Sequence, residues 1–374
     1  MNGIAHVVAR KELIQIGLKT WFERNARDLP WRNSKDPYLI YLSEIILQQT
    51  RIDQGTPYFL RFANEFPNIE SLAAATLDRV LKEWEGLGYY SRARNLHRSA
   101  RLIVELYDGV IPADFEQLRS LPGIGDYTAA AILSIAFRKP YAVLDSNVIR
   151  ILTRLSAFSN EVSSSLTRKT LQVFATDLLD HKAPGRHNES IMDLGALVCR
   201  PKNPDCIHCP LNQFCLACKS GHPFGRPMDF PVKKKRARVP HYDIAVGIVL
   251  NQNEEFLIQR RAEEGMLGGL WEFPGGKRES GEMLHESCRR ELREELGIDV
   301  AVGEALPPVN HAYSHFKITM YAFHCSIQSG VPISKKGLPV RWVARDKMSD
   351  YAFPKANRAL FETLKIGVPL PERG

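Results

Sequence analysis

The sequence predicts two domains of different class, a mainly α-helical domain followed by a mixed α/β domain. A chain of 374 residues exceeds the size at which a single hydrophobic core stops growing. From residue 11 to about 195, apolar residues recur at intervals of three and four, as in ELIQIGLKTWF and LDRVLKEWEGL, which is typical of helices. Beyond residue 241, HYDIAVGIVL and FKITMYAFHCSI alternate as strands do, and one helix, ESCRRELREEL, lies between them.

The two predicted domains differ in charge. The formal net charge is +8. Residues 1–240 contain 33 Lys and Arg against 24 Asp and Glu, whereas residues 241–374 contain 17 against 18. The positive excess of the first part indicates attraction to a polyanion such as DNA, although a basic surface that only favours solubility has the same composition.

The sequence indicates no membrane segment. No apolar run is long enough to cross a bilayer, and the N-terminal stretch lacks the features of a secretory signal. We therefore expect a cytoplasmic, nucleoid-associated protein of bacterial type with no membrane partner.

Four cysteines, Cys199, Cys206, Cys209 and Cys215, are separated by six, two and five residues. In a chain without a secretory signal, this crowding favours metal or cluster ligation over disulfides. The spacing suits the four-cysteine ligation of a [4Fe–4S] cluster. The alternative is zinc bound by two CxxC pairs that end at Cys218, but the spacer between those pairs is shorter than in zinc ribbons. In the cluster interpretation, Cys218 is not a ligand.

Residues 219–240 read KSGHPFGRPMDFPVKKKRARVP. This segment is rich in Pro, Gly and basic side chains and shows no periodicity. We interpret this segment as an interdomain linker. Its basic side chains suit contact with a phosphate backbone and equally a solvated tether. They are Lys233, Lys234, Lys235, Arg236 and Arg238.

The segment LPGIGDYTAAAILSIA predicts a helix end, a turn through Gly123 and Gly125, and a new helix from about Asp126. Glycines bring backbone N–H groups close to an anion, and a helix N-terminus favours negative charge, so a DNA phosphate fits there. A Pro-Gly turn between two packed helices gives the same pattern. Further on, Asp145 stands at a helix N-cap position, and capping alone would explain it.

Together, LPGIGDYTA, Asp145 and the cysteine set resemble the helix-hairpin-helix base-excision DNA glycosylases up to about residue 218. SEIILQQT resembles the adenine DNA glycosylases of the MutY family almost letter for letter. The resemblance implies an all-helical domain with a [4Fe–4S] loop and an active site between two subdomains. It also implies that Glu44 is the catalytic acid and that Asp145 faces the cationic sugar. Three further active-site residues are implied: Asn147, Tyr127 and Glu189.

The reaction of this family requires two carboxyl groups. Adenine departs as a neutral base when a ring nitrogen is protonated, while the sugar becomes oxocarbenium-like. Glu44 would donate the proton and then activate water, and Asp145 would stabilise the cation. Helical periodicity places Glu44 on one side of YLSEIILQQTRI with Tyr41, Gln48 and Arg51, so a solvated glutamate is the alternative.

Tyr127 indicates base removal without efficient strand cleavage. In bifunctional relatives, a lysine at this place in LPGxGxxTA attacks the sugar and forms a Schiff base, and here that lysine is absent. The target base must leave the stack before it reacts. The resemblance, together with the glycine turn, implies DNA contacts at Gln49, Thr50, Leu87, Tyr89, Gly123 and Gly125. For Leu87 and Tyr89, core packing is the alternative.

The α/β part contains a complete Nudix box that begins at Gly276, passes through Glu282 and ends in RELREELGI at 290–298. Three glutamates share one helix face, and carboxylate oxygens suit Mg²⁺ that bridges a pyrophosphate. These Mg²⁺ candidates are Glu291, Glu294 and Glu295. A surface ion pair between Arg290 and Glu294 is the alternative.

Two resemblances coexist in this domain. IAVGIVL, WEFPGGK and AFPKAN resemble Nudix enzymes that hydrolyse 8-oxo-dGTP, and Asn357 would be their base-reading residue. HAYSHF resembles the loop with which adenine DNA glycosylases recognise 8-oxoguanine, which implies that role for Tyr313, Ser314 and His315. In most of those glycosylases the metal-binding box has decayed, and this chain departs from that pattern.

We therefore expect a monomeric adenine DNA glycosylase that acts on duplex DNA with adenine opposite 8-oxoguanine or guanine. A second expectation is hydrolysis of oxidised nucleoside triphosphates with Mg²⁺. Two alternatives stay open. One is a lesion-binding protein without turnover, against which the presence of both Glu44 and Asp145 argues. The other is a Nudix hydrolase with a DNA-tethering domain.

Overall fold

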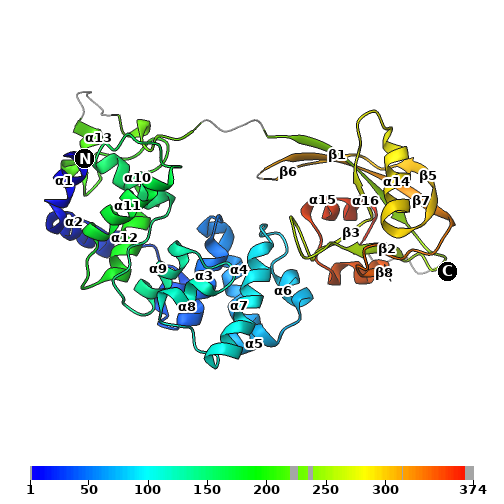
Figure 1. Ribbon diagram of the computed structural model, residues 1–374, viewed down its shortest axis with the longest axis horizontal. Helices are drawn as coiled ribbons and strands as arrows, with labels where there is room; N and C mark the ends of the chain where they lie inside the picture. The colour runs from blue at the N-terminus through cyan, green and yellow to red at the C-terminus, as the bar shows by residue number, and fades with distance from the viewer. Residues whose placement is uncertain (1, 220–225, 235–238, 314, 367–374) are drawn as a thin grey trace. The chain divides into compact units, whose positions relative to one another are not determined.

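The computed structural model describes residues 2–219, 226–234, 239–313 and 315–366, and it confirms both predicted fold classes. By compactness the chain divides into two units. The first contains residues up to 74 together with residues 98–236, and the second contains residues 75–97 together with the chain from residue 237 onward. The first unit is helical, and the second combines a short helical segment with the α/β fold (Figure 1).

The predicted domain limits, 1–218 and 241–374 with a linker between them, stay a prediction, because the compact units divide the chain elsewhere. Four residues singled out in the sequence lie outside the described ranges: Lys235, Arg236, Arg238 and Ser314. No helix within the described ranges is long and apolar enough to span a membrane.

The first unit is built from helices, most of which lie between residues 11 and 195, where the sequence periodicity predicted helical structure. In chain order they are α1 (Asn2–Val8), α2 (Lys11–Asn25), η1 (Pro30–Asn33), α3 (Pro37–Leu47), α4 (Ile52–Glu65), α5 (Ile69–Ala74), α8 (Phe115–Ser120), α9 (Asp126–Ile135), α10 (Ser146–Leu155), α11 (Ser165–Leu178), α12 (Pro184–Leu197), η2 (Asn212–Phe214), α13 (Leu216–Lys219) and η3 (Pro227–Asp229). Helix α6 (Leu77–Glu83) belongs to the second unit, and α7 (Ser91–Tyr107) runs through the boundary.

Side-chain caps fix where several of these helices begin. Asp36 accepts a hydrogen bond from the backbone N–H of Tyr38 at 2.8 Å, and proline occupies the first position of α3. Asp114 caps α8 by accepting the N–H groups of Glu116 and Gln117, both at 3.0 Å. Each cap satisfies N–H groups that would otherwise lack an intrahelical partner.

Helix α3 ends earlier than the periodicity predicted. Gln48 already has non-helical dihedral angles, and Arg51 stands at the N-cap of α4. The predicted polar side shared by Tyr41, Glu44, Gln48 and Arg51 is therefore wrong. Tyr41 is only 1% exposed and Glu44 only 8%, because α3 packs against both α4 and α9.

The turn between α8 and α9 has the predicted form. Gly123 has a φ of +80°, a left-handed conformation that favours glycine. Helix α9 begins at Asp126, as the sequence predicted. A Cβ atom at Gly125 would meet no described heavy atom within 4 Å, so a ligand can approach the backbone at the start of α9.

The α/β part contains two sheets. The larger has the order β4-β1-β7-β5, with β6 also paired to β7; β1 and β7 run parallel, and the other pairs are antiparallel. Its strands are β1 (His241–Val249), β4 (Gly275–Lys277), β5 (Asp299–Ala305), β6 (Val309–Ala312) and β7 (Lys317–Ser329). The smaller antiparallel sheet contains β2 (Phe256–Arg260), β3 (Trp271–Glu272) and β8 (Val340–Val343).

Alternation along β1 divides its side chains between two cores. Ala245 and Val249 pack in the core that includes α14 (Leu284–Leu296), while Val246 and Ile248 pack in the core that includes the C-terminal helices. Those helices are η4 (Arg345–Asp350), α15 (Lys355–Arg358) and α16 (Leu360–Thr363). Because α14 packs on β1 and β4, the glutamates of the Nudix box lie beside the glycines of β4.

Candidate active site and the cysteine loop

A cavity of about 660 Å³ in the first unit is lined by all five predicted catalytic residues. Its walls come from η1, α3, α9, α10 and α12, and its volume falls in the usual range for small-molecule sites. The five residues are Glu44, Tyr127, Asp145, Asn147 and Glu189. Side chains that are far apart in the sequence therefore meet in one place.

Glu44 is a buried carboxyl group on α3. Burial raises its pKa to about 7, because charging it away from water is costly. A hydrogen bond with Tyr127 opposes this shift, and the nearby charges of Asp145 and Glu189 add to it. A large fraction of Glu44 is consequently protonated near neutral pH, as a proton donor requires.

Asp145 is held at the N-terminus of α10 by two hydrogen bonds. Its Oδ1 accepts from the backbone N–H of Val148 at 2.7 Å, and its Oδ2 accepts from Nδ2 of Asn147 at 2.8 Å. Burial raises the pKa of Asp145, while these donors stabilise its charged form. The residue caps the helix and also lines the cavity, so capping and a role in the site coexist.

A chain of hydrogen bonds joins Asp145 to the first cysteine of the loop. Asn147 Oδ1 accepts from Arg150 Nη2 at 2.8 Å, and Arg150 Nε donates to the backbone oxygen of Cys199 at 2.7 Å. Arg150 Nη2 also donates to the Gly195 carbonyl at 2.7 Å. The sequence analysis missed Arg150, because nothing in its local pattern distinguishes it from a surface arginine.

Glu189 belongs to a second network that the sequence analysis also missed. Arg32 Nε donates to Glu189 Oε1 at 3.0 Å, and both terminal nitrogens of Arg32 donate to the fully buried carboxylate of Asp193. Arg27 donates to the same carboxylate. Burial alone would raise the pKa of Asp193, but the two guanidinium groups hold it below its ordinary value. Asp193 thus provides the counter-charge of Arg32, the cation that orients Glu189.

The residues predicted to contact DNA differ in exposure. Gln49, Thr50 and Gly125 line the cavity. Leu87 is 4% exposed, which is what core packing requires, whereas Tyr89 is 37% exposed. A role in wedging the duplex stays a prediction for both.

The cysteine loop brings its thiols close enough for their charges to affect one another. The titration of Cys209 is affected by the charges of Cys199, Cys215 and Cys206, and burial raises the pKa of Cys206 and of Cys209 to about 12. Arg154 Nη1 lies 3.3 Å from the sulfur of Cys199. Buried thiols of such high pKa ionise readily only when a metal compensates their charge.

The arrangement of these thiols bears on the kind of metal. No three His, Cys, Asp or Glu side chains in the described ranges are placed to hold a single metal ion. Zinc requires its ligands to converge on one ion, whereas each cysteine of a cubane cluster binds a different iron atom. Four cysteine thiols in one loop are the donor set of a [4Fe–4S] cluster, and this cluster stays a prediction.

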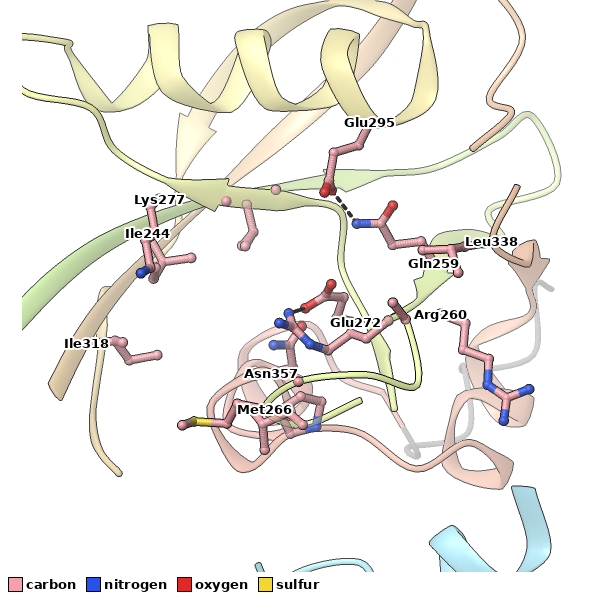
Figure 2. Close-up of a pocket in the computed structure, with 18 of the residues that line it drawn as sticks. Ile244, Gln259, Arg260, Met266, Glu272, Lys277, Glu295, Ile318, Leu338 and Asn357 are labelled. Carbon is pink, nitrogen blue, oxygen red and sulfur yellow. Dashed lines mark hydrogen bonds and ion pairs between the residues drawn. The ribbon is translucent and has the colours of Figure 1, made fainter. Parts of the chain in front are cut away.

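A second cavity, of about 410 Å³, lies in the α/β fold and is shown in Figure 2. In it, Arg261 donates to Glu272 at 2.5 Å, and Gln259 donates to Glu295 at 2.5 Å. Burial raises the pKa of Glu272 to about 7. Asn357 is 3% exposed, and its Oδ1 accepts from a backbone N–H at 2.9 Å, which leaves its amide nitrogen for another acceptor.

Arg290 connects three glutamates of the Nudix box by hydrogen bonds. Its guanidinium group donates to Glu282 at 2.8 Å, to Glu291 at 2.9 Å and to Glu294 at 3.1 Å. The sequence suggested an ion pair between Arg290 and Glu294. This ion pair is present, and Arg290 forms two others, with Glu282 and Glu291. A Cβ at Gly276 would lie within 2.5 Å of the Glu291 carboxylate, so any other residue at this position would displace that side chain.

A third cavity, of about 430 Å³, also belongs to the second unit and is lined by Tyr89, Tyr313 and His315. The ring of Tyr313 packs edge-on against His311, with centroids 4.5 Å apart, and lies 4.9 Å from Phe316. Burial raises the pKa of Tyr313 to about 12, so its hydroxyl stays protonated and can donate a hydrogen bond.

Comparison with known families defines the class of protein. The model of the HhH-GPD superfamily of base excision DNA repair proteins matches residues 42–176, and the NUDIX domain model matches residues 245–363. Among solved structures, a thermostable thymine-DNA glycosylase aligns with a TM-score of 0.51 and 27% identity over 56% of this chain and 96% of its own. The fold is thus that of a helix-hairpin-helix base-excision repair protein joined to a Nudix domain.

Full-length relatives narrow this class. The adenine DNA glycosylase of Rattus norvegicus is 32% identical over 92% of this chain and 76% of its own length. That of Buchnera aphidicola from Acyrthosiphon pisum is 34% identical over 79% of this chain and 81% of its own. The chain belongs to the adenine DNA glycosylase family.

The Asp193 network generates a prediction about stability. Replacing Asp193 by Asn would leave two guanidinium groups without their buried counter-charge, which should lower the free energy of unfolding by roughly 3 kcal/mol. Urea denaturation measures the change. Asp53→Asn is the matched control, because Asp53 pairs with Arg51 on the exposed surface and should leave the free energy of unfolding nearly unchanged. Equal effects of the two substitutions would contradict this account.

Proposed function

We propose that this protein removes adenine from duplex DNA at positions opposite 8-oxoguanine or guanine, by hydrolysis of the N-glycosidic bond. The observation that carries the proposal is a pair of carboxyl groups in one cavity, the buried Glu44 and the partly buried Asp145. Because the chain belongs to the adenine DNA glycosylase family, we infer that the leaving base is adenine. A lesion-binding protein without turnover would have no need for a proton donor whose pKa is raised to about 7.

In this proposal the two carboxyl groups have different tasks. The protonated Glu44 donates to a ring nitrogen of adenine, and the base leaves neutral. Asp145, whose charged form is stabilised by Val148 and Asn147, faces the positive charge that develops on the sugar. The carboxylate that Glu44 has become then takes a proton from the attacking water. Glu189, oriented by Arg32, lies where it can bind the flipped base.

The same proposal assigns recognition of the opposite base to the second unit. Tyr313 and His315 line a cavity there together with Tyr89. A purine fits between aromatic side chains, and the protonated hydroxyl of Tyr313 can donate to a base oxygen. The [4Fe–4S] cluster, when bound by Cys199, Cys206, Cys209 and Cys215, would cross-link the loop that follows α12. We further propose that the protein acts as a monomer in the cytoplasm.

The raised pKa of Glu44 predicts the pH dependence of base removal. The acid form is the reactive one, so the single-turnover rate of adenine release from an A:8-oxoguanine duplex should be constant below about pH 6 and fall about tenfold per pH unit well above the pKa near 7. Glu44→Gln should lower the rate by roughly 10²–10⁴-fold. Glu23→Gln, on the exposed surface of α2, is the control and should not change it. A rate that stays constant through neutral pH, or an active Glu44→Gln variant, would exclude Glu44 as the acid.

The absence of an amine at Tyr127 predicts a monofunctional enzyme. A tyrosine cannot form a Schiff base with deoxyribose, and its hydroxyl is engaged with Glu44 and with the sulfur of Met192 at 3.3 Å. Borohydride should therefore trap little covalent protein–DNA complex during turnover. Tyr127→Lys should raise the trapped fraction. Efficient trapping by the unmodified protein would refute this part of the proposal.

A second candidate activity is hydrolysis of oxidised purine nucleoside triphosphates. The complete box, with Arg290 gathering three carboxylates beside a 410 Å³ cavity, favours it. Carboxylate oxygens are the donors that Mg²⁺ prefers, and Arg290 would have to release Glu291 and Glu294 for the ion to bind. Asn357 offers an amide to the base.

This activity is measured as pyrophosphate release from 8-oxo-dGTP by the full chain with Mg²⁺. We expect release that Glu294→Gln largely abolishes, because a box ligand is lost, while adenine release continues. Glu304→Gln, on β5 outside the box, is the matched control. If the unmodified chain releases no pyrophosphate at any Mg²⁺ concentration, this second activity is withdrawn. A Glu44→Gln variant that keeps it would show that the two activities are separate.

A further inference from the structure

One loop of the α/β fold lines two cavities. It consists of residues 261–270, which connect β2 to β3 (the β2–β3 loop). Gly265, Met266 and Leu267 of this loop line the 410 Å³ cavity of Figure 2, the nucleotide cavity. The same three residues line the 430 Å³ cavity of the second unit, the opposite-base cavity. The site proposed for a free nucleotide and the site proposed for the base opposite adenine therefore share a wall.

Tyr313 is the fourth residue that lines both cavities. Its ring lies 4.5 Å from the ring of His311 and 4.9 Å from the ring of Phe316, measured between centroids. Of the two cavities, His311 lines only the opposite-base cavity and Phe316 only the nucleotide cavity. The backbone N–H of Tyr313 donates to the Phe316 carbonyl at 2.8 Å. The ring of Tyr313 is thus packed against one wall residue of each cavity.

Hydrogen bonds hold the backbone of the β2–β3 loop. Arg94, near the start of α7, donates from Nη1 to the Gly268 carbonyl at 2.6 Å and from Nη2 to the Gly265 carbonyl at 3.3 Å. Arg260 Nε donates to the Gly269 carbonyl at 3.1 Å. These bonds oppose a retreat of the loop backbone when a ligand enters either cavity.

The side chains of the shared wall are therefore the parts that respond to a ligand. Met266 is 46% exposed, and its unbranched side chain has three rotatable bonds. It can pack against a base in either cavity, but not in both at once. The same holds for the ring of Tyr313. Because the backbone is held, a side chain that packs against a purine in one cavity is withdrawn from the other.

We propose that an oxidised purine nucleotide bound in the nucleotide cavity weakens recognition of the base opposite adenine in the opposite-base cavity. This inference rests on the proposed function, which assigns a ligand to each cavity. Coupling between two sites is reciprocal, so DNA that contains 8-oxoguanine weakens nucleotide binding by the same factor. The free nucleotide inhibits adenine removal by lowering the affinity for DNA. It leaves the chemical step unchanged, because the cavity that holds Glu44 shares none of the four wall residues.

The first test measures single-turnover adenine release from an A:8-oxoguanine duplex by the full chain as 8-oxo-dGMP is added. We expect the protein concentration that gives half the maximal rate to rise at least about fivefold at saturating nucleotide. The rate at saturating protein should not change. Thymidine monophosphate is the matched control, because it carries the same phosphate without a purine, and it should have little effect.

Two results of this test would overturn the inference. One is a half-maximal concentration that 8-oxo-dGMP leaves unchanged. The other is an equal rise with thymidine monophosphate, which would indicate that anions compete for the DNA-binding surface. An unmodified protein that releases no adenine at any concentration would instead refute the proposed function.

The second test measures the dissociation constant of 8-oxo-dGMP by equilibrium dialysis and does not depend on catalysis. The constant should rise by the same factor when Glu44→Gln protein, which leaves the adenine in place, is saturated with the A:8-oxoguanine duplex. Absence of nucleotide binding, or binding that the duplex does not weaken, would contradict the proposal.

Variants of the shared wall show whether the coupling passes through it. Met266→Ala, introduced together with Glu44→Gln, should bring the factor closer to one. Met283→Ala is the matched control, because this methionine is 60% exposed at the N-terminus of α14 and lines neither cavity. It should keep the full factor. A factor that stays the same in both Met266→Ala and Tyr313→Ala would exclude the shared wall as the cause.

Discussion

Two carboxyl groups, Glu44 and Asp145, share one cavity, and the cost of charging both of them there is the main constraint on the first unit. Burial raises the pKa of Glu44 and of Asp145. Glu44 has one such donor, Tyr127, whereas Asp145 accepts hydrogen bonds from both Val148 and Asn147, which stabilise its charged form. The pair therefore divides into an acid and a carboxylate, and this division depends on where α3 and α10 place the two side chains.

The surrounding helices hold in place the side chains that set the different protonation states of Glu44 and Asp145. Asp145 is fixed by the start of α10, and through Asn147 and Arg150 it is joined to the backbone of Cys199. On the other side of the cavity, Asp193 neutralises Arg32, which in turn orients Glu189. The backbone of the cysteine loop and the geometry of the cavity are thus connected by α10, in which every residue from Val148 to Leu155 is buried.

Much of the fold could be predicted from the sequence, because helical and strand periodicities are local. The turn at Gly123 and the start of α9 followed from glycine conformation and helix capping. The polar side assigned to α3 was wrong, since periodicity cannot show that a helix is buried on nearly all sides. Glu44 was singled out by family resemblance, and its burial became evident only from the packing of α3.

The supporting residues could not be predicted for a different reason. Arg32 and Asp193 are separated by 161 positions, and neither belongs to a recognisable motif. In the α/β part, Glu295 belongs to the Nudix box, but its partner Gln259 is 36 positions away and belongs to no motif. The glutamates of the Nudix box, by contrast, follow from spacing within one helix, and their grouping around Arg290 agrees with it. Sequence patterns indicate which residues could react, whereas long-range pairs decide their charge.

The protonation state of Glu44 is the most direct test of this account. Infrared difference spectra between the unmodified protein and Glu44→Gln, recorded across a pH titration, isolate the carboxyl stretch of this one residue. The account predicts a protonated carboxyl band that disappears with a midpoint near pH 7. A Glu44 that is fully ionised by about pH 5, as an unperturbed glutamate would largely be, contradicts it.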